Sequence, residues 1–163
     1  MGRRTTKLGK KGDPPKTAVA KTAKKSGAAS SGGGTTAAPA LLPGECAVGT
    51  FNDLVKKGKR GDNLTPHHIP SDTFMKEKGV AGYTRGTGIC IMMEQPATGG
   101  RHRQTSTYGR SPDLSQTPKQ ALDREIADAR KIYKDAGLHT PQVEASLQDI
   151  RKKNKAAFPG VFD

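Results

Sequence analysis

Two prolines enclose a pair of adjacent histidines and restrict the backbone around them. Residues 64–70 read Leu-Thr-Pro-His-His-Ile-Pro. Each proline fixes its own φ and disfavours a helical conformation for the residue before it, so residues 64–69 are predicted to be extended. A second strand is predicted at 89–93, where an apolar run lies between a glycine and a proline. The two segments should pair as an irregular antiparallel hairpin, within a core that covers about residues 61–109.

Short helices are predicted beside this hairpin. One should end at Gly58, and the other should begin after Ser71 as its N-cap and end at Gly79. Phe51, Leu54 and Val55 recur at helical spacing in the first, and Phe74 and Met75 are expected on the inner side of the second.

Two longer helices are predicted at the C-terminal end, at about 118–136 and 141–157. Each follows a Thr-Pro pair that suits an N-cap and the first helical position, and Gln120 completes a capping box in the first of them. Apolar residues keep to one face of each helix. They are Leu122, Ile126, Ala129, Tyr133 and Ala136, and then Val143, Leu147 and Ile150. A short loop between the helices predicts an antiparallel pair, and the fold class is α+β.

The N-terminal segment differs in composition from the rest. Residues 1–43 combine Lys and Arg with Gly, Ser, Thr, Ala and Pro, and they carry too little apolar surface to offset the entropy of ordering. We predict a disordered basic tail there, followed by one domain at 44–163. The tail is either a source of salt-sensitive affinity for nucleic acid or a linker to a larger delivery protein.

Net charge points to an anionic partner. The chain has a formal charge of +13 and a pI of about 10.0, which favours nucleic acid or an anionic surface. No apolar run approaches the roughly 20 residues that cross a bilayer, so membrane insertion is not expected. No ordinary secretory signal is visible, and we expect a cytoplasmic protein or one delivered into a target cell by a secretion system.

Histidines carry the chemistry predicted for the hairpin. A neutral imidazole can act as general base toward water, and a divalent cation can stabilise the leaving oxygen of a phosphodiester. His67 and His68 would share such a task only if the strand twists or bulges, because adjacent strand residues point to opposite faces. His102, on the returning segment, would complete a metal site. The phosphate-binding candidates are Arg101, Arg103, Lys59 and Arg60.

Three features of the chain resemble the HNH, or His-Me finger, nucleases. They are the motif His-His-Ile-Pro, an apolar strand that begins with a glycine, and a His-Arg segment followed by a tyrosine and a helix. The likeness is to the endonuclease VII-like nuclease domains of bacterial polymorphic toxins, and it covers about residues 61–136. The chain departs from that pattern at Ser106, where a further histidine is expected. It also lacks the middle asparagine that orients the base, a role open to Glu94, Gln95 or a backbone carbonyl.

The resemblance implies a ββα-metal core and a metal-dependent endonuclease that acts on DNA rather than RNA. It implies that His67 binds the metal, that His68 is the general base, and that His102 is a metal ligand or phosphate contact. Mg²⁺ is the expected ion, although imidazoles also accept Zn²⁺, Ni²⁺ or Mn²⁺. The family also implies an acidic immunity protein as partner.

Two other interpretations stay open. The charge alone predicts a non-catalytic basic module that binds nucleic acid. The histidines would alternatively form a structural zinc site, whose removal would unfold the domain.

Overall fold

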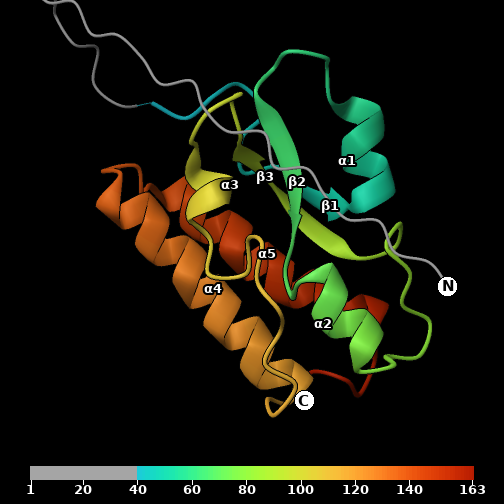
Figure 1. The fold of residues 1–163 in the computed structure, drawn as a ribbon. Helices are drawn as coiled ribbons and strands as arrows, with labels where there is room; N and C mark the ends of the chain where they lie inside the picture. Colours follow the sequence, from blue (N-terminus) through green and yellow to red (C-terminus); the bar gives the residue numbers. More distant parts are fainter. Residues whose placement is uncertain (1–39) are drawn as a thin grey trace, which may run out of the picture. The chain divides into compact units, whose positions relative to one another are not determined.

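The computed structural model describes residues 40–163, which form a three-stranded antiparallel sheet and five helices. The strands are β1 (Val48–Thr50), β2 (Leu64–His68) and β3 (Ile89–Glu94), in the spatial order β1-β3-β2. The helices are α1 (Phe51–Lys57), α2 (Asp72–Glu77), α3 (Arg101–Gln104), α4 (Pro118–Asp135) and α5 (Pro141–Ala157). Figure 1 shows α4 and α5 crossing one side of the sheet and α1 lying on the other.

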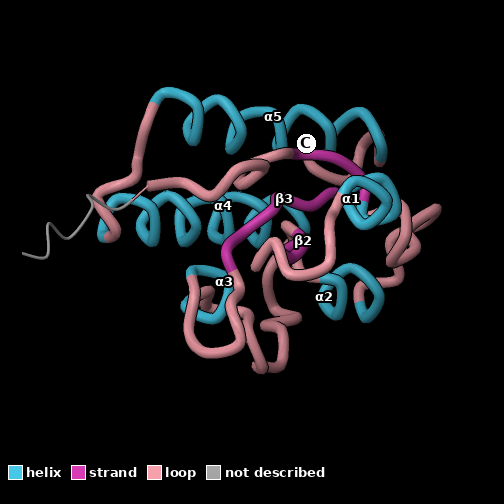
Figure 2. The backbone as a smooth tube through the Cα atoms, turned by 90° about the horizontal axis from the view of Figure 1, so that it is seen from above, coloured by secondary structure: helices cyan, strands magenta, loops and turns pink. Residues whose placement is uncertain are grey.

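Strand β3 is the centre of the fold because both of its faces are covered. Ile91 and its neighbours two positions away, Ile89 and Met93, belong to the main core, which is shared with α4 and α5. Cys90 and Met92 point the other way and pack with Leu54 of α1 in a smaller cluster. The uninterrupted apolar run of β3 therefore reflects burial on two sides, and α1, sheet and C-terminal helices form three layers (Figure 2).

Strand β2 lies at the free edge of the sheet. Backbone hydrogen bonds join Ile69 N to Ile89 O at 3.1 Å and Gln95 N to Asn63 O at 2.6 Å, so the bonded positions of β2 are odd-numbered. Pro66 occupies an unbonded position, and its cross-strand partner Met92 bonds instead to Cys46 and Ala47, just before β1. The missing N–H of Pro66 thus faces away from β3 and costs the sheet no hydrogen bond.

The predicted α+β class is confirmed, with the β2–β3 hairpin and both C-terminal helices in place. The capping box of Thr117 and Gln120 starts α4, and the Thr140 hydroxyl accepts from Val143 N at the start of α5. Two short elements were not predicted, β1 and α3, because three or four residues carry no periodic signal.

The prediction of a disordered tail falls almost entirely on residues 1–39, which lie outside the described part of the chain. Order is present from its first described residues, since Leu41 packs against the main core and Leu42 O accepts from Glu45 N at 2.9 Å. From residue 40 onward, no helix combines the length and apolar character needed to cross a bilayer.

One acid in the core lacks a hydrogen-bond partner. Glu125 of α4 is 2% exposed, and within residues 40–163 neither of its carboxylate oxygens forms a hydrogen bond of normal length and angle, although the Ser71 backbone and Arg124 lie near enough to lower its pKa slightly. Burial raises the pKa of Glu125 to about 8, although the charge of Arg124, whose Nη2 lies 3.6 Å from Oε1, opposes the shift. The folded protein therefore keeps a proton at neutral pH that the unfolded chain has lost.

We predict that this carboxyl makes stability fall as pH rises from the ordinary value of 4.5 to about 8. The unfolding free energy should drop by about 1.4 kcal/mol for each pH unit between these two pKa values. Glu125→Gln should flatten that slope and be the more stable protein at alkaline pH. Urea unfolding at a series of pH values measures this, with exposed Glu77→Gln as control. Parallel slopes in wild type and Glu125→Gln would contradict the prediction.

Candidate functional site

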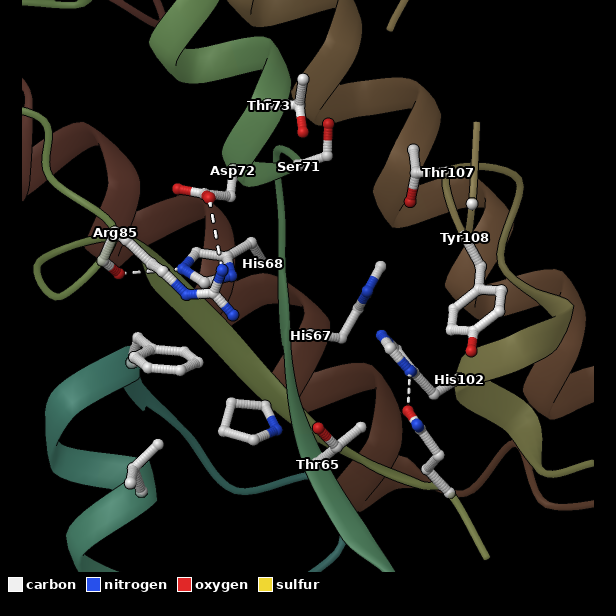
Figure 3. A pocket seen from close by; sticks show the side chains of 15 residues that line it. Thr65, His67, His68, Ser71, Asp72, Thr73, Arg85, His102, Thr107 and Tyr108 are labelled. Carbon is white, nitrogen blue, oxygen red and sulfur yellow. Dashed lines mark hydrogen bonds and ion pairs between the residues drawn. The ribbon is translucent and has the colours of Figure 1, made fainter. Parts of the chain in front are cut away.

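A cleft of about 570 Å³ runs along the free edge of β2 and contains all three predicted histidines. Its walls come from α1, from β2 after its first residue, from the start of α2, from the loop before β3, and from the segment that includes α3 and Tyr108. Figure 3 shows His67 and His102 on one side of the β2 ribbon and His68 on the other.

His67 and His102 meet although they are 35 positions apart in the chain. Their rings have centroids 4.9 Å apart and lie at 68° to each other. The Nδ1 of His102 is hydrogen-bonded to Oε1 of Gln95, which accepts, so Nδ1 carries the proton and Nε2 keeps a lone pair. Within residues 40–163 no group forms a hydrogen bond with the His67 ring. The pair thus offers imidazole nitrogens without a competing partner.

Both rings are neutral near pH 7. Burial, together with the charges of His102 and His68, lowers the pKa of His67 from 6.5 to about 3. Burial and the nearby charge of Arg103 lower the pKa of His102 to about 4. Neutral imidazoles can bind a metal ion or accept a hydrogen bond, and protonated ones cannot.

His68 lies on the opposite face because neighbouring strand residues alternate. It pairs across the ladder with Cys90, on the α1 side, whereas His67 pairs with Ile91 on the main-core side. Its ring stacks on Phe51 with centroids 5.1 Å apart and an interplanar angle of 17°. Burial lowers its pKa, although the carbonyl of Arg85 and the charge of Asp72 oppose this.

A backbone carbonyl fixes the His68 tautomer. His68 Nε2 lies 2.9 Å from Arg85 O. A carbonyl can only accept, so Nε2 must donate, and Nδ1 is the basic nitrogen. Of the three candidates to orient this ring, the carbonyl is the one in place. Gln95 bonds His102, and Glu94 is paired with Arg101 at 3.2 Å.

The twist or bulge that would turn His67 and His68 to one face is absent from β2, although both side chains line the same cleft. The strand stays regular through residues 64–68, so two histidines meet and the third shares only the cleft. In the described residues, no group of three or more His, Cys, Asp or Glu side chains is arranged to hold a metal ion.

Arg101 was predicted to contact phosphate, but its guanidinium is occupied. The side chain is 9% exposed and forms two hydrogen bonds of 2.6 Å with the Glu45 carboxylate, whose side chain is fully buried. Burial alone would raise the pKa of Glu45, but the hydrogen bonds from Arg101 and from Leu42 N lower it. Tyr133 OH adds a further bond of 3.1 Å. This pair anchors α3 and thereby holds His102 against His67.

The other predicted cations lie at the margins. Arg103 is exposed, donates from Nη2 to Ala97 O at 3.1 Å, and has its guanidinium 6.0 Å from the Tyr108 ring. Lys59 and Arg60 line an adjoining hollow of about 250 Å³. That hollow shares Val55 and Pro66 with the cleft, so the two surfaces are continuous.

Several site residues carried no signal in the sequence. Phe51 was predicted as part of a short helix, and Arg85 was one of many cations in a loop. Gly88 is required for space, since a Cβ there would lie 2.6 Å from His68 Cδ2 and 2.8 Å from Tyr83 Oη. A composition-based analysis cannot find these residues, because their roles depend on the His68 ring position.

No protein-family model, no curated protein and no solved structure matches this chain. A functional assignment therefore depends on the chemistry of the cleft.

We predict that Arg101→Met destabilises the protein by about 3–5 kcal/mol, because Glu45 would remain buried without its partner. Adding Glu45→Gln should recover part of the loss, since the buried charge is then removed. Urea unfolding at neutral pH measures both, and Arg103→Met is the matched exposed control. A loss below about 1 kcal/mol would show that the pair does not anchor α3.

We also predict that Gly88→Ala displaces the His68 ring, because the added methyl overlaps it. The expected cost is about 1–3 kcal/mol of stability and altered imidazole resonances of His68 in NMR spectra. Gly58→Ala is the control, as the nearest atom to its Cβ is at 3.5 Å. Unchanged His68 resonances in Gly88→Ala would refute the steric argument.

Proposed function

We propose that this chain is a nuclease that hydrolyses phosphodiester bonds of nucleic acid, DNA rather than RNA, as a toxin or effector domain. One observation carries the proposal. Two neutral imidazoles meet in a cleft of a basic protein, and a third imidazole in the same cleft has its basic nitrogen defined by a backbone carbonyl.

The order of elements supports the resemblance to the His-Me finger nucleases. His67 and His68 come from the first strand of a hairpin, β2–β3, and His102 comes from the short helix that follows the second strand. Apart from α2, which is inserted between the two strands, β2, β3 and α3 follow the strand–strand–helix order of a ββα-metal core, which we propose for residues 64–104. The positions of the histidines are consistent with the roles that the resemblance implies, because His67 lies beside His102 and His68 lies apart from this pair.

His68 is the proposed general base. Its Nδ1 would accept a proton from the attacking water while Nε2 stays bonded to Arg85 O. The stacked Phe51 ring limits rotation of the imidazole, so the orientation of the base is set before substrate arrives.

His67 and His102 are the proposed ligands of a divalent ion. The Gln95 bond to His102 Nδ1 is the outer contact that orients a ligating imidazole, and it leaves Nε2 available. The expected ion, Mg²⁺, prefers oxygen and would keep waters and phosphate oxygens around it, whereas two imidazole nitrogens suit Zn²⁺, Ni²⁺ or Mn²⁺ better. When bound, such an ion supplies Lewis-acid stabilisation of the leaving oxygen.

Exposed cations would hold the substrate backbone. Arg103 lies beside Tyr108, which lines the cleft, and Lys59 and Arg60 line the continuous hollow. The family resemblance further suggests an acidic immunity protein that covers this basic surface in the producing cell, and delivery of the chain into a target cell.

The second candidate is a module that binds nucleic acid without cleaving it. The charge of +13 favours it. A plasmid-nicking assay separates the two functions. Cleavage that needs a divalent ion and stops with EDTA supports the nuclease, and salt-sensitive binding without cleavage supports the module.

We predict that His68→Ala lowers the cleavage rate by at least about 100-fold while folding and DNA binding persist, because the general base is lost. Plasmid nicking, circular dichroism and a mobility-shift assay measure the three properties. His139→Ala is the matched control, since His139, in the α4–α5 loop, bonds Glu144 of α5 and lies outside the cleft. Wild-type cleavage by His68→Ala would remove this residue as the base.

A further inference from the structure

Two arginine–aromatic pairs flank the histidines, one on each side of β2. They are Phe51 with Arg85, beside His68, and Tyr108 with Arg103, beside His102. We propose that these pairs stack the bases next to the scissile phosphate, so that the cleft takes a single strand with unpaired bases in preference to an intact duplex. The inference rests on the proposed nuclease function and specifies its substrate.

On the His68 side, the open stacking surface is the Arg85 guanidinium. Its central carbon lies 4.9 Å from the centre of the Phe51 ring, which is itself stacked on His68. The Arg85 side chain is 62% exposed, and its Nη1 lies 3.8 Å from the Asp72 carboxylate. A planar guanidinium held over an aromatic ring is a surface on which nucleic-acid bases stack.

On the His102 side, the surface is the Tyr108 ring. It is 40% exposed, lies 5.2 Å from the His102 ring at 84°, and is accompanied by Arg103. The large apolar side chains that remain exposed in residues 40–163 are Val55, Tyr108 and Leu114. Val55 and Tyr108 line the cleft, and Leu114 does not. Apolar surface is therefore left uncovered where a flanking base would lie.

The depth of the histidines determines which bases can reach these surfaces. His67 and His68 are 6% and 7% exposed, so a phosphate must enter the cleft to meet them. The nucleotides on either side then lie against the walls. In a duplex, the faces of the bases are covered by their neighbours in the stack, and only an unpaired base can stack on a side chain.

The cations extend this path. The hollow bordered by Lys59 and Arg60 continues from the cleft across Val55 and Pro66. A nucleic-acid strand that leaves the histidines in that direction would meet these positive charges beyond its stacked base, and they would neutralise its phosphates. A basic groove with interspersed aromatic rings is the arrangement that binds single strands with little sequence preference.

Binding measured in EDTA tests the proposal without cleavage. The full chain is titrated against a fluorescein-labelled oligonucleotide of about 12 nucleotides and against its duplex, with anisotropy as readout. Wild type should bind the single strand more tightly. Tyr108→Ala should weaken single-strand binding by about five- to one-hundred-fold and change duplex binding little. Tyr108→Phe should retain the affinity, and exposed Leu114→Ala should match wild type.

Two further measurements separate stacking from charge. Tyr108→Ala should lower the affinity without changing its dependence on salt, because no phosphate contact is lost. Arg85→Lys keeps the charge and removes the planar surface, so it should weaken binding of the single strand more than binding of the duplex. Equal binding of single strand and duplex by wild type, or equal losses on both in Tyr108→Ala, would overturn the proposal.

These outcomes are distinct from failure of the nuclease function. Metal-dependent cleavage combined with equal single-strand and duplex binding would refute the stacking sites and leave the nuclease. A single-strand preference lost in Tyr108→Ala, with no cleavage under any metal, would refute the nuclease and leave the stacking sites.

Discussion

The alternation of side chains along an edge strand determines how this site is built. His67 and His68 are neighbours in β2 and must point to opposite faces of the sheet, one toward the main core and one toward α1. Because β2 lies at the free edge, both faces open onto the same cleft. A substrate crossing that edge would meet an imidazole pair on one side and a single oriented imidazole on the other.

A buried ion pair holds the far half of the site in place. Arg101 and Glu45 are 56 positions apart, and their two hydrogen bonds tie the four residues of α3 to the start of the domain. A helix this short has almost no stability of its own. The position of His102 therefore depends on the contacts of the adjacent Arg101. The charge of Arg101 is paired inside the protein and is not available to a ligand.

The sequence alone was sufficient to predict the elements whose signals are local. The prolines around the double histidine, the capping box at Thr117 and the periodic apolar faces predicted the hairpin and the two long helices. It was insufficient for contacts between distant residues, such as Glu45 with Arg101 or Arg85 O with His68. All three predicted histidines line one cleft, but their relative directions depend on the regularity of β2, which composition does not determine.

Pro66 has a consequence beyond the chemistry of the cleft. An uncovered edge strand is a template to which a strand of another molecule can add, and such addition leads to aggregation. Pro66 removes one outward-facing donor from this edge at a position where β3 does not need it. The same residue that keeps the backbone extended before the histidines therefore also discourages self-association through the edge they occupy, and keeps that edge open to ligands.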